Sequence, residues 1–316
     1  MNKNSKLPKL ALVIPCYNEG AMLKITIEQL LRLLNDYVER EVIAANSFAL
    51  LVDDGSKDET WQILQSSSNH FIKAIKLSHN VGHQHALIAG LTYVTNQVDC
   101  CISLDADLQD DISVTEEMIA NYTSGSQIVY GVRGSRETDK AMKRGTAQLF
   151  YKLMKRMGVD LIYNHADFRL LSNRVLVELQ KYKEVNLFLR GLFPQMGFKS
   201  SKVYYKRKAR IADQTKYSFK QMLHLAVNGI TSFSNFPLKM ITYIGFAIFF
   251  CSFIISLWVL FVWTSGRAVP GWASITLPVY FLGGVQLLAL GIIGEYLGKI
   301  YLETKARPRF HIEEEI

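Results

Sequence analysis

The ten residues Cys100-Cys101-Ile102-Ser103-Leu104-Asp105-Ala106-Asp107-Leu108-Gln109 join a short apolar run to an acidic cluster. The apolar run predicts a buried strand, and open α/β sheets bind their ligands at the carboxyl ends of such strands. Two carboxylates one residue apart, followed by an amide, are hard oxygen ligands of the kind that suits Mg²⁺ or Mn²⁺. We therefore expect Asp105, Asp107 and Gln109 to form a metal site, with a solvated acidic turn as the alternative.

The first 135 residues repeat this pattern of apolar strand and amphipathic helix. Such alternation predicts an α/β fold with a mostly parallel, twisted sheet that is covered on both faces. The expected strands are Leu10–Ile14, Phe48–Val52, Ile72–Leu77, Cys100–Leu104 and Ile128–Val132, and the expected helices are Met22–Tyr37, Glu59–Ser66, Gln84–Thr95 and Val114–Tyr122.

A polar motif directly follows each of the five expected strands. Because the carboxyl ends of parallel strands meet at one edge of a sheet, all five motifs should open onto the same site. They are Pro15–Glu19, Asp53–Ser56, Asn80–His83, Asp105–Gln109 and Arg133–Arg136. His83 and His85 have no further His or Cys nearby, so we expect them at a helix start or on the surface rather than on a metal.

The composition favours a globular protein at a membrane over a nucleic-acid-binding one. The 316 residues carry a net charge of +8 and are 49% hydrophobic, enough for one good-sized domain with an appendage or for two small domains. Basic residues gather beside apolar segments, which suits an anionic membrane surface. The four cysteines show no C-x-x-C spacing, so we expect free thiols in a reducing compartment. The polar N-terminus predicts no cleavable signal peptide.

Two segments in the last third, Leu238–Trp263 and Ala273–Gly294, are apolar enough to cross a hydrocarbon core of about 30 Å. Two buried helices of a soluble domain are the alternative. Basic residues flank the pair on its outer sides, so the positive-inside rule predicts a hairpin with both termini cytoplasmic. Tyr217–Phe236 is expected to be helical and interfacial, and Asp139–Met157 is either a second membrane-surface helix or a solvated basic face.

The sequence therefore predicts a multi-pass protein of the cell inner (plasma) membrane. Its expected parts are a cytoplasmic catalytic domain over 1–210, interfacial amphipathic helices over 211–236, two transmembrane helices over 237–298 and a cytoplasmic tail over 299–316.

The motifs Pro15–Glu19, Asp53–Thr60, Asn80–Ala86 and Asp105–Gln109, in this order and spacing, resemble those of family 2 glycosyltransferases. Three further motifs narrow the resemblance to the polyprenyl-phosphate type, which includes dolichol-phosphate mannose synthase and the bactoprenol glucosyltransferases. These motifs are Asp167–Leu170, Gln214–Tyr217 and Gly294–Gly298. The resemblance covers about Leu10 to Pro308 and implies a nucleotide-diphospho-sugar transferase (GT-A type) fold.

Several site residues follow from this resemblance. It assigns nucleotide-sugar binding to Pro15, Tyr17, Glu19, Val52, Asp54, Asp105, Ala106 and Lys216. From its chemistry, Asp54 can accept a hydrogen bond from a uracil N–H, although Asp53–Ser56 also suits a helix-capping turn. The catalytic group would comprise Asp105 and Asp107, which hold the metal and diphosphate, and Asp167, which orients or activates the acceptor.

An acceptor with a phosphate group requires cations. Arg133, Arg136 and Arg169 are the expected acceptor-phosphate residues because guanidinium groups pair bidentately with phosphate. Lys216 could reach either phosphate. Since a phosphate monoester is largely ionised near neutrality, we expect Asp167 to matter more for positioning than for proton transfer.

The expected activity is inverting transfer of a hexose or N-acetylhexosamine, with glucose favoured, from a UDP-sugar to undecaprenyl phosphate. The expected cofactor is Mg²⁺ or Mn²⁺, and the expected partners are the UDP-sugar donor, undecaprenyl phosphate and the lipid bilayer, with no nucleic acid. Whether the protein forms a homo-oligomer is left open. The alternatives are a processive polysaccharide synthase, which the lack of a Q-x-x-R-W stretch disfavours, and an inactive membrane scaffold or flippase partner.

Overall fold

The computed structural model describes residues 7–134, 165–184, 187, 189–205 and 272–316, together with single residues and short runs between 238 and 261. The expected segments Asp139–Met157 and Tyr217–Phe236, and most of Leu238–Trp263, lie outside this described part. The chain divides into two compact units. The first comprises residues 1–152, 160–216 and 306–316, and the second comprises residues 153–159 and 217–305.

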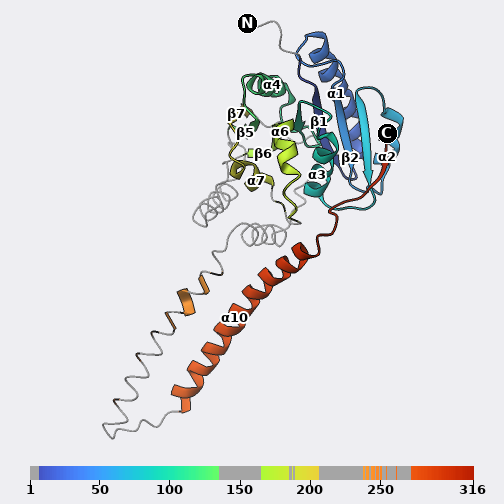
Figure 1. Ribbon diagram of the computed structural model, residues 1–316. Helices are drawn as coiled ribbons and strands as arrows, with labels where there is room; N and C mark the ends of the chain where they lie inside the picture. Colours follow the sequence, from blue (N-terminus) through green and yellow to red (C-terminus); the bar gives the residue numbers. More distant parts are fainter. Residues whose placement is uncertain are drawn as a thin grey trace. The chain divides into compact units, whose positions relative to one another are not determined.

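The first unit is built on one sheet with the strand order β7-β5-β6-β4-β1-β2-β3-β8 (Figure 1). All five strands expected from the sequence are present. The strands are β1 (Leu10–Cys16), β2 (Phe48–Asp53), β3 (Ile72–Leu77), β4 (Cys100–Ser103), β5 (Ile128–Arg133), β6 (His165–Ser172), β7 (Ser200–Tyr205) and β8 (Ile312–Glu315).

The five expected strands run in the same direction, which confirms the mostly parallel sheet. β1 pairs in parallel with β2 and β4, and β2 pairs in parallel with β3. β6 lies between β4 and β5 and is antiparallel to both, so β5 again runs parallel to β4. β7 is parallel to β5, and β8 is antiparallel to β3. The carboxyl ends of β1 to β5 therefore share one edge of the sheet.

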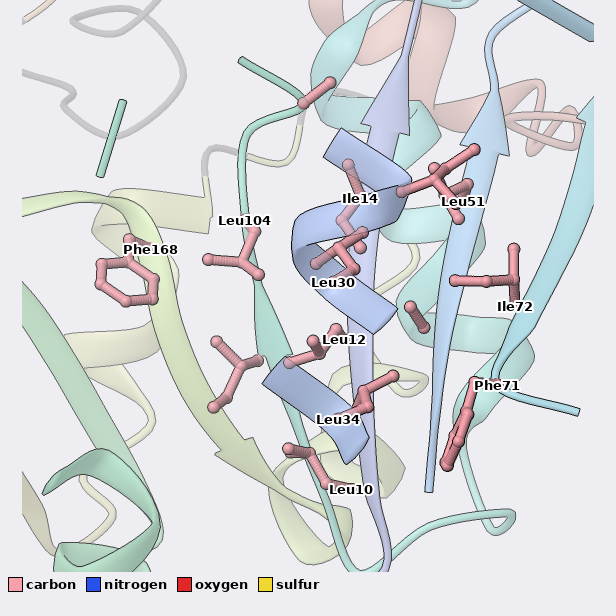
Figure 2. Close-up of a cluster of buried hydrophobic side chains, with 14 of the residues drawn as sticks. Leu10, Leu12, Ile14, Leu30, Leu34, Leu51, Phe71, Ile72, Leu104 and Phe168 are labelled. Carbon is pink, nitrogen blue, oxygen red and sulfur yellow. The ribbon is translucent and has the colours of Figure 1, made fainter. Parts of the chain in front are cut away.

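Helices cover both faces of this sheet, since every residue of β1, β2 and β4 is buried. Successive side chains of a strand point to opposite faces. Leu12 and Ile14 of β1 therefore pack with Leu30 and Leu34 of α1 in one cluster (Figure 2), and Val13 packs in a second cluster with α3. The helices of this unit are α1 (Gly20–Glu39), α2 (Thr60–Ser67), α3 (His83–Val94), α4 (Thr115–Thr123), α6 (Asn173–Leu179) and α7 (Leu189–Gln195), with a 3₁₀ turn η1 (Ile112–Val114).

The spacing of apolar residues explains α1. Leu23, Ile27, Leu30 and Leu34 recur at steps of three and four, so they form one stripe on the helix, and all four are buried. Burying each such side chain contributes roughly 1.5–3 kcal/mol. This stripe places the start of α1 against the carboxyl ends of β1 and β4, where the polar motifs lie.

The second unit, described by itself, contains the 33-residue helix α10 (Trp272–Thr304). At about 1.5 Å per residue, α10 is roughly 50 Å long. Among the described residues, one helical stretch is long and apolar enough to cross a membrane, Val285–Thr304. The expected span Ala273–Gly294 lies within α10 and overlaps this stretch. The other expected span, Leu238–Trp263, falls mostly outside the described residues.

Residues 299–316, expected as a tail, are divided between the end of α10 and the strand β8. β8 extends the sheet of the first unit: the N–H of Ile316 donates to the carbonyl of Ala74 and the N–H of Ala74 to that of Ile316, both at 2.9 Å. Trp61 Nε1 donates to Glu314 Oε2 at 3.2 Å. All four β8 residues are exposed, so no apolar pattern marks this strand in the sequence.

Candidate active site

The acidic motif forms a tight turn after β4. The N–H of Leu108 donates to the carbonyl of Asp105 at 3.1 Å, and the N–H of Gln109 donates to Asp107 Oδ1 at 3.2 Å. Leu108 has a φ of 42°, in the left-handed region that is unusual for leucine. The Thr26 hydroxyl donates to the carbonyl of Ala106 at 2.8 Å, which fixes the turn to α1. These hydrogen bonds therefore hold Leu108 in a backbone conformation that leucine rarely adopts.

Asp105 lies among several other carboxylates. Burial raises its pKa above the ordinary value, and Asp167, Asp110 and Asp107 raise it further, while His83 acts in the opposite direction. A site where carboxylates gather in this way favours the binding of a cation. Gln109, the third expected ligand, is only 7% exposed.

The register of β4 and β6 explains why Asp105 and Asp167 meet. Ser103 of β4 lies opposite Arg169 of β6 in an antiparallel pair. Asp105 lies two residues after Ser103, and Asp167 lies two residues before Arg169. The antiparallel register therefore brings the two aspartates next to each other. The Ser103 hydroxyl also donates to the carbonyl of Asp167, which holds the end of the pairing closed.

Two arginines bind the carboxylate of Asp167. Arg169 Nη2 donates to Oδ1. Arg190 of α7 donates from Nη2 to Oδ2 at 2.7 Å and from Nε to Oδ1 at 3.3 Å. Burial opposes the charged form of Asp167, but the two guanidinium groups outweigh burial and hold its pKa below the ordinary value. Asp167 is therefore a weak base and is well suited to positioning.

The position of Arg169 differs from the expected direct contact with an acceptor. Its side chain is 1% exposed, and its guanidinium carbon lies 4.9 Å from the centre of the Phe193 ring. Its Nη1 is buried and has no hydrogen-bond partner among the described residues. In this arrangement Arg169 supports Asp167 from inside the protein.

Arg133 belongs to a second buried group, with Asp110 and Tyr205. The Tyr205 hydroxyl donates to Asp110 Oδ1 at 2.7 Å, and Arg133 Nε donates to that hydroxyl at 3.3 Å. Arg133 Nη2 lies 3.5 Å from Asp110 Oδ1. This group links the end of the acidic turn to the ends of β5 and β7. Arg136 and Lys216 lie outside the described residues.

His83 lies near two carboxylates of the site. It is the first residue of α3, as expected, but its Nε2 lies 3.6 Å from Asp105 Oδ1 and 3.9 Å from Asp167 Oδ2. The backbone N–H groups of Val81 and Gly82, just before it, donate to the two carboxylate oxygens of Asp54 at 2.8 and 2.9 Å. Asp54 thereby fixes the loop that carries His83.

The loops after β1 and β2 are tied to each other. The N–H of Asn18 donates to Ser56 Oγ, and the N–H of Lys57 donates to Asn18 Oδ1, both at 2.9 Å. Gly55 has a φ of +65°, and an added Cβ would lie 2.6 Å from the backbone of His79, so the close approach of the loop after β2 to the loop after β3 requires glycine.

The residues expected to bind the nucleotide differ in exposure along this edge. Pro15 and Val52 are buried in β1 and β2, and Asp54 is 2% exposed. Tyr17 is 42% exposed and Glu19 is half-buried at the start of α1. Among the described residues expected to bind the nucleotide sugar, Tyr17 is therefore the most accessible.

The donor chemistry of the turn suits a hard divalent cation. In the described part of the chain, no group of three or more His, Cys, Asp and Glu side chains is arranged to hold a metal ion alone. Asp105 and Asp107 instead offer two carboxylates, an arrangement typical of Mg²⁺ or Mn²⁺ that shares its remaining positions with water and substrate phosphates. The residues present thus fit a cation that binds together with a diphosphate.

Sequence reasoning missed Asp110, Tyr205 and Arg190. Asp110 directly follows the acidic motif Asp105–Gln109, but no sequence pattern indicates that its side chain is buried. Arg190 lies on a seven-residue helix without a recognisable motif. The same-face spacing of Asp167 and Arg169 on one strand was the available sign that these two residues pair.

Comparisons with known proteins give the family. The model of glycosyl transferase family 2 matches residues 11–179. The uncharacterized glycosyltransferase YkoT of Bacillus subtilis is 50% identical over 97% of this chain and 91% of its own length. The bactoprenol glucosyl transferase of Shigella phage SfX is 37% identical over 96% and 99%. Mannosyl-3-phosphoglycerate synthase from Rubrobacter xylanophilus aligns with a TM-score of 0.48 at 13% identity, over 70% of this chain and 71% of that one. The chain is therefore a glycosyltransferase and belongs to glycosyl transferase family 2.

Proposed function

We propose that this glycosyltransferase moves glucose from UDP-glucose to undecaprenyl phosphate and inverts the anomeric carbon. The observation that carries the proposal is the 37% identity, over nearly the whole chain, to a relative named bactoprenol glucosyl transferase. The product is a lipid monophosphosugar, which serves as a donor for cell-envelope glycosylation.

The charges of the site support a donor and an anionic acceptor side by side. Asp105 and Asp107 supply negative charge, and Asp167, which like Asp105 lies near His83, is bound by two arginines. When bound, Mg²⁺ or Mn²⁺ supplies charge stabilisation to the departing UDP. Asp105 and Asp107 would hold that ion and orient the diphosphate, with Gln109 behind them.

The acceptor side does not require a strong base. A phosphate monoester has its second pKa near 6, so its attacking oxygen is already largely ionised at neutral pH. The pKa of Asp167 lies below its ordinary value because Arg190 and Arg169 outweigh the effect of burial. Asp167 therefore orients the acceptor side and balances its charge while the phosphate oxygen attacks the anomeric carbon in line.

The pairing of β8 with β3 supports a membrane hairpin. Residues before 206 and after 311 contribute to one hydrogen-bonded sheet, so they lie on the same side of any membrane that the chain crosses. A segment that leaves and rejoins that sheet crosses an even number of times. One crossing is assigned to α10 and the other to Leu238–Trp263, with the sheet and both termini in the cytoplasm.

The test is release of UDP from UDP-glucose by the purified full-length protein, with and without undecaprenyl phosphate, followed by analysis of the lipid product. We expect UDP release that depends on the lipid and a single hexose on the product. A polymeric product would instead indicate a processive synthase. If undecaprenyl phosphate accelerates UDP release from no UDP-sugar in a donor panel, the proposal is wrong.

A further inference from the structure

The two arginines that bind Asp167 differ sharply in their access to solvent. The side chain of Arg169 is 1% exposed, whereas that of Arg190 is 43% exposed. Both guanidinium groups contact the same carboxylate, and each remains charged at any relevant pH. A ligand that approaches Asp167 from solvent therefore meets Arg190, while Arg169 lies behind.

The helix that carries Arg190, α7, is held in place by buried apolar side chains. Leu189, Leu192 and Phe193 of α7 are buried in the core, and the ring of Phe193 packs against the guanidinium of Arg169. The two donor contacts from Arg190 to Asp167 fix the other end of its side chain. Arg190 is thus presented at the site in a defined orientation, which lowers the entropic cost of recognition.

The charged groups of the site differ in what they can bind. Arg190 and Arg169 both contact the carboxylate of Asp167, and Arg190 is the one of the two guanidinium groups that solvent reaches. Asp105 and Asp107 are carboxylates, which suit a cation. The two substrates need opposite environments, because the donor arrives with a divalent cation and the acceptor with a phosphate.

We propose that Arg190 is the guanidinium that binds the phosphate group of the acceptor, in the place that sequence reasoning gave to Arg169. The ligand chemistry is a phosphate monoester, and recognition is a charge-assisted contact to its oxygens. Arg169 is a positioning residue that acts through Asp167. This inference rests on the proposed function, because it names the residue by which that acceptor is held.

The central variant is Arg190→Lys, which keeps the charge and loses the planar fork. We expect the KM for undecaprenyl phosphate to rise about tenfold or more, with little change in the KM for UDP-glucose. The matched control is Arg32→Lys on α1, where an exposed arginine pairs with Glu28 outside the site. This control should leave both KM values unchanged.

Two further measurements separate phosphate binding from support of Asp167. Inorganic phosphate should inhibit the wild-type enzyme in competition with the lipid, and Arg190→Lys should weaken this inhibition about as much as it raises the lipid KM. An unfolding midpoint of Arg190→Lys close to that of the wild type reports an intact fold. If inorganic phosphate inhibits without competing with the lipid, the site recognises the lipid chain instead and the assignment falls.

The failures of the two proposals are distinguishable. If wild-type protein shows no lipid-dependent UDP release, the proposed function fails. If wild-type protein is active and Arg190→Lys lowers kcat with an unchanged lipid KM, Arg190 only positions Asp167 and the phosphate assignment is overturned, while the function stands.

Discussion

Replacing Tyr205 with Phe tests whether the buried group behind the acidic turn stabilises the fold. The variant removes one hydroxyl, which donates to Asp110 Oδ1 at 2.7 Å and accepts from Arg133 Nε at 3.3 Å. It retains the ring, which packs edge-on against Phe168 at 5.3 Å between centroids. Any effect therefore reports the hydroxyl alone.

The expected cost follows from the burial of Asp110. Its side chain is 4% exposed, and within the described part of the chain its Oδ2 has no hydrogen bond, so loss of the Tyr205 contact leaves the 3.5 Å contact to Arg133 there. Hydrogen bonds to charged groups contribute about 1.5–3 kcal/mol. A loss of about 2 kcal/mol lowers the Tm of a domain of this size by roughly 4–8 °C.

The assay is thermal unfolding of the full-length protein in detergent, compared with the neighbouring variant Tyr204→Phe. Tyr204 is 64% exposed, so its loss of a hydroxyl should change stability by less than about 0.5 kcal/mol. A double-mutant cycle with Asp110→Asn should give a coupling above about 1 kcal/mol. Equal Tm values for the two tyrosine variants would refute the reasoning.

Three other outcomes are expected. Asp107→Asn should nearly abolish transfer without lowering the Tm, and chelation of divalent cations should abolish wild-type turnover until Mg²⁺ or Mn²⁺ is restored; normal turnover in either experiment contradicts the metal assignment. Termination after His311 removes β8 and should lower the free energy of unfolding by about 1–3 kcal/mol, and an unchanged free energy would show that the pairing is dispensable. The lowered pKa of Asp167 contributes stability above about pH 4 that is lost as the pH falls through its folded value, so the stability difference between wild type and Asp167→Asn should narrow from about pH 5 to 3; a difference that stays constant over this range would exclude that contribution.

The sequence allowed much of the fold to be predicted because its central strands and helices carry strong apolar patterns. β1 to β5 and α1 to α4 were all expected within a few residues of their bounds. β6 was missed because it inserts between β4 and β5 from a distant part of the chain, and β8 because it is exposed along its length. Such non-local pairing leaves little local signal.

The sequence predicted those site residues that directly follow a strand. It did not predict the roles of residues such as Arg169, which depend on how deeply the side chain is buried. The common direction of β1 to β5 brings the acidic turn to the shared edge, as expected. Arginine is rarely buried completely, so the sequence favours an exposed Arg169, and only the tertiary packing against Phe193 reveals that it is enclosed. His83 was correctly placed at a helix start, but its distance to Asp105 and Asp167 depends on the loop that Asp54 holds.

The distance in sequence between β3 and β8 sets an order of events during biosynthesis. Lys76 of β3 and Glu314 of β8 pair across 238 positions, so the ribosome adds all of the intervening residues before the outer edge of β3 finds its neighbour. Until then the nascent protein presents an open strand edge, which is a known template for aggregation. α10 precedes β8, so this long apolar helix is synthesised before the sheet closes. The outer edge of β3 is therefore covered only late in synthesis, and a translation product truncated before β8 would keep this edge open.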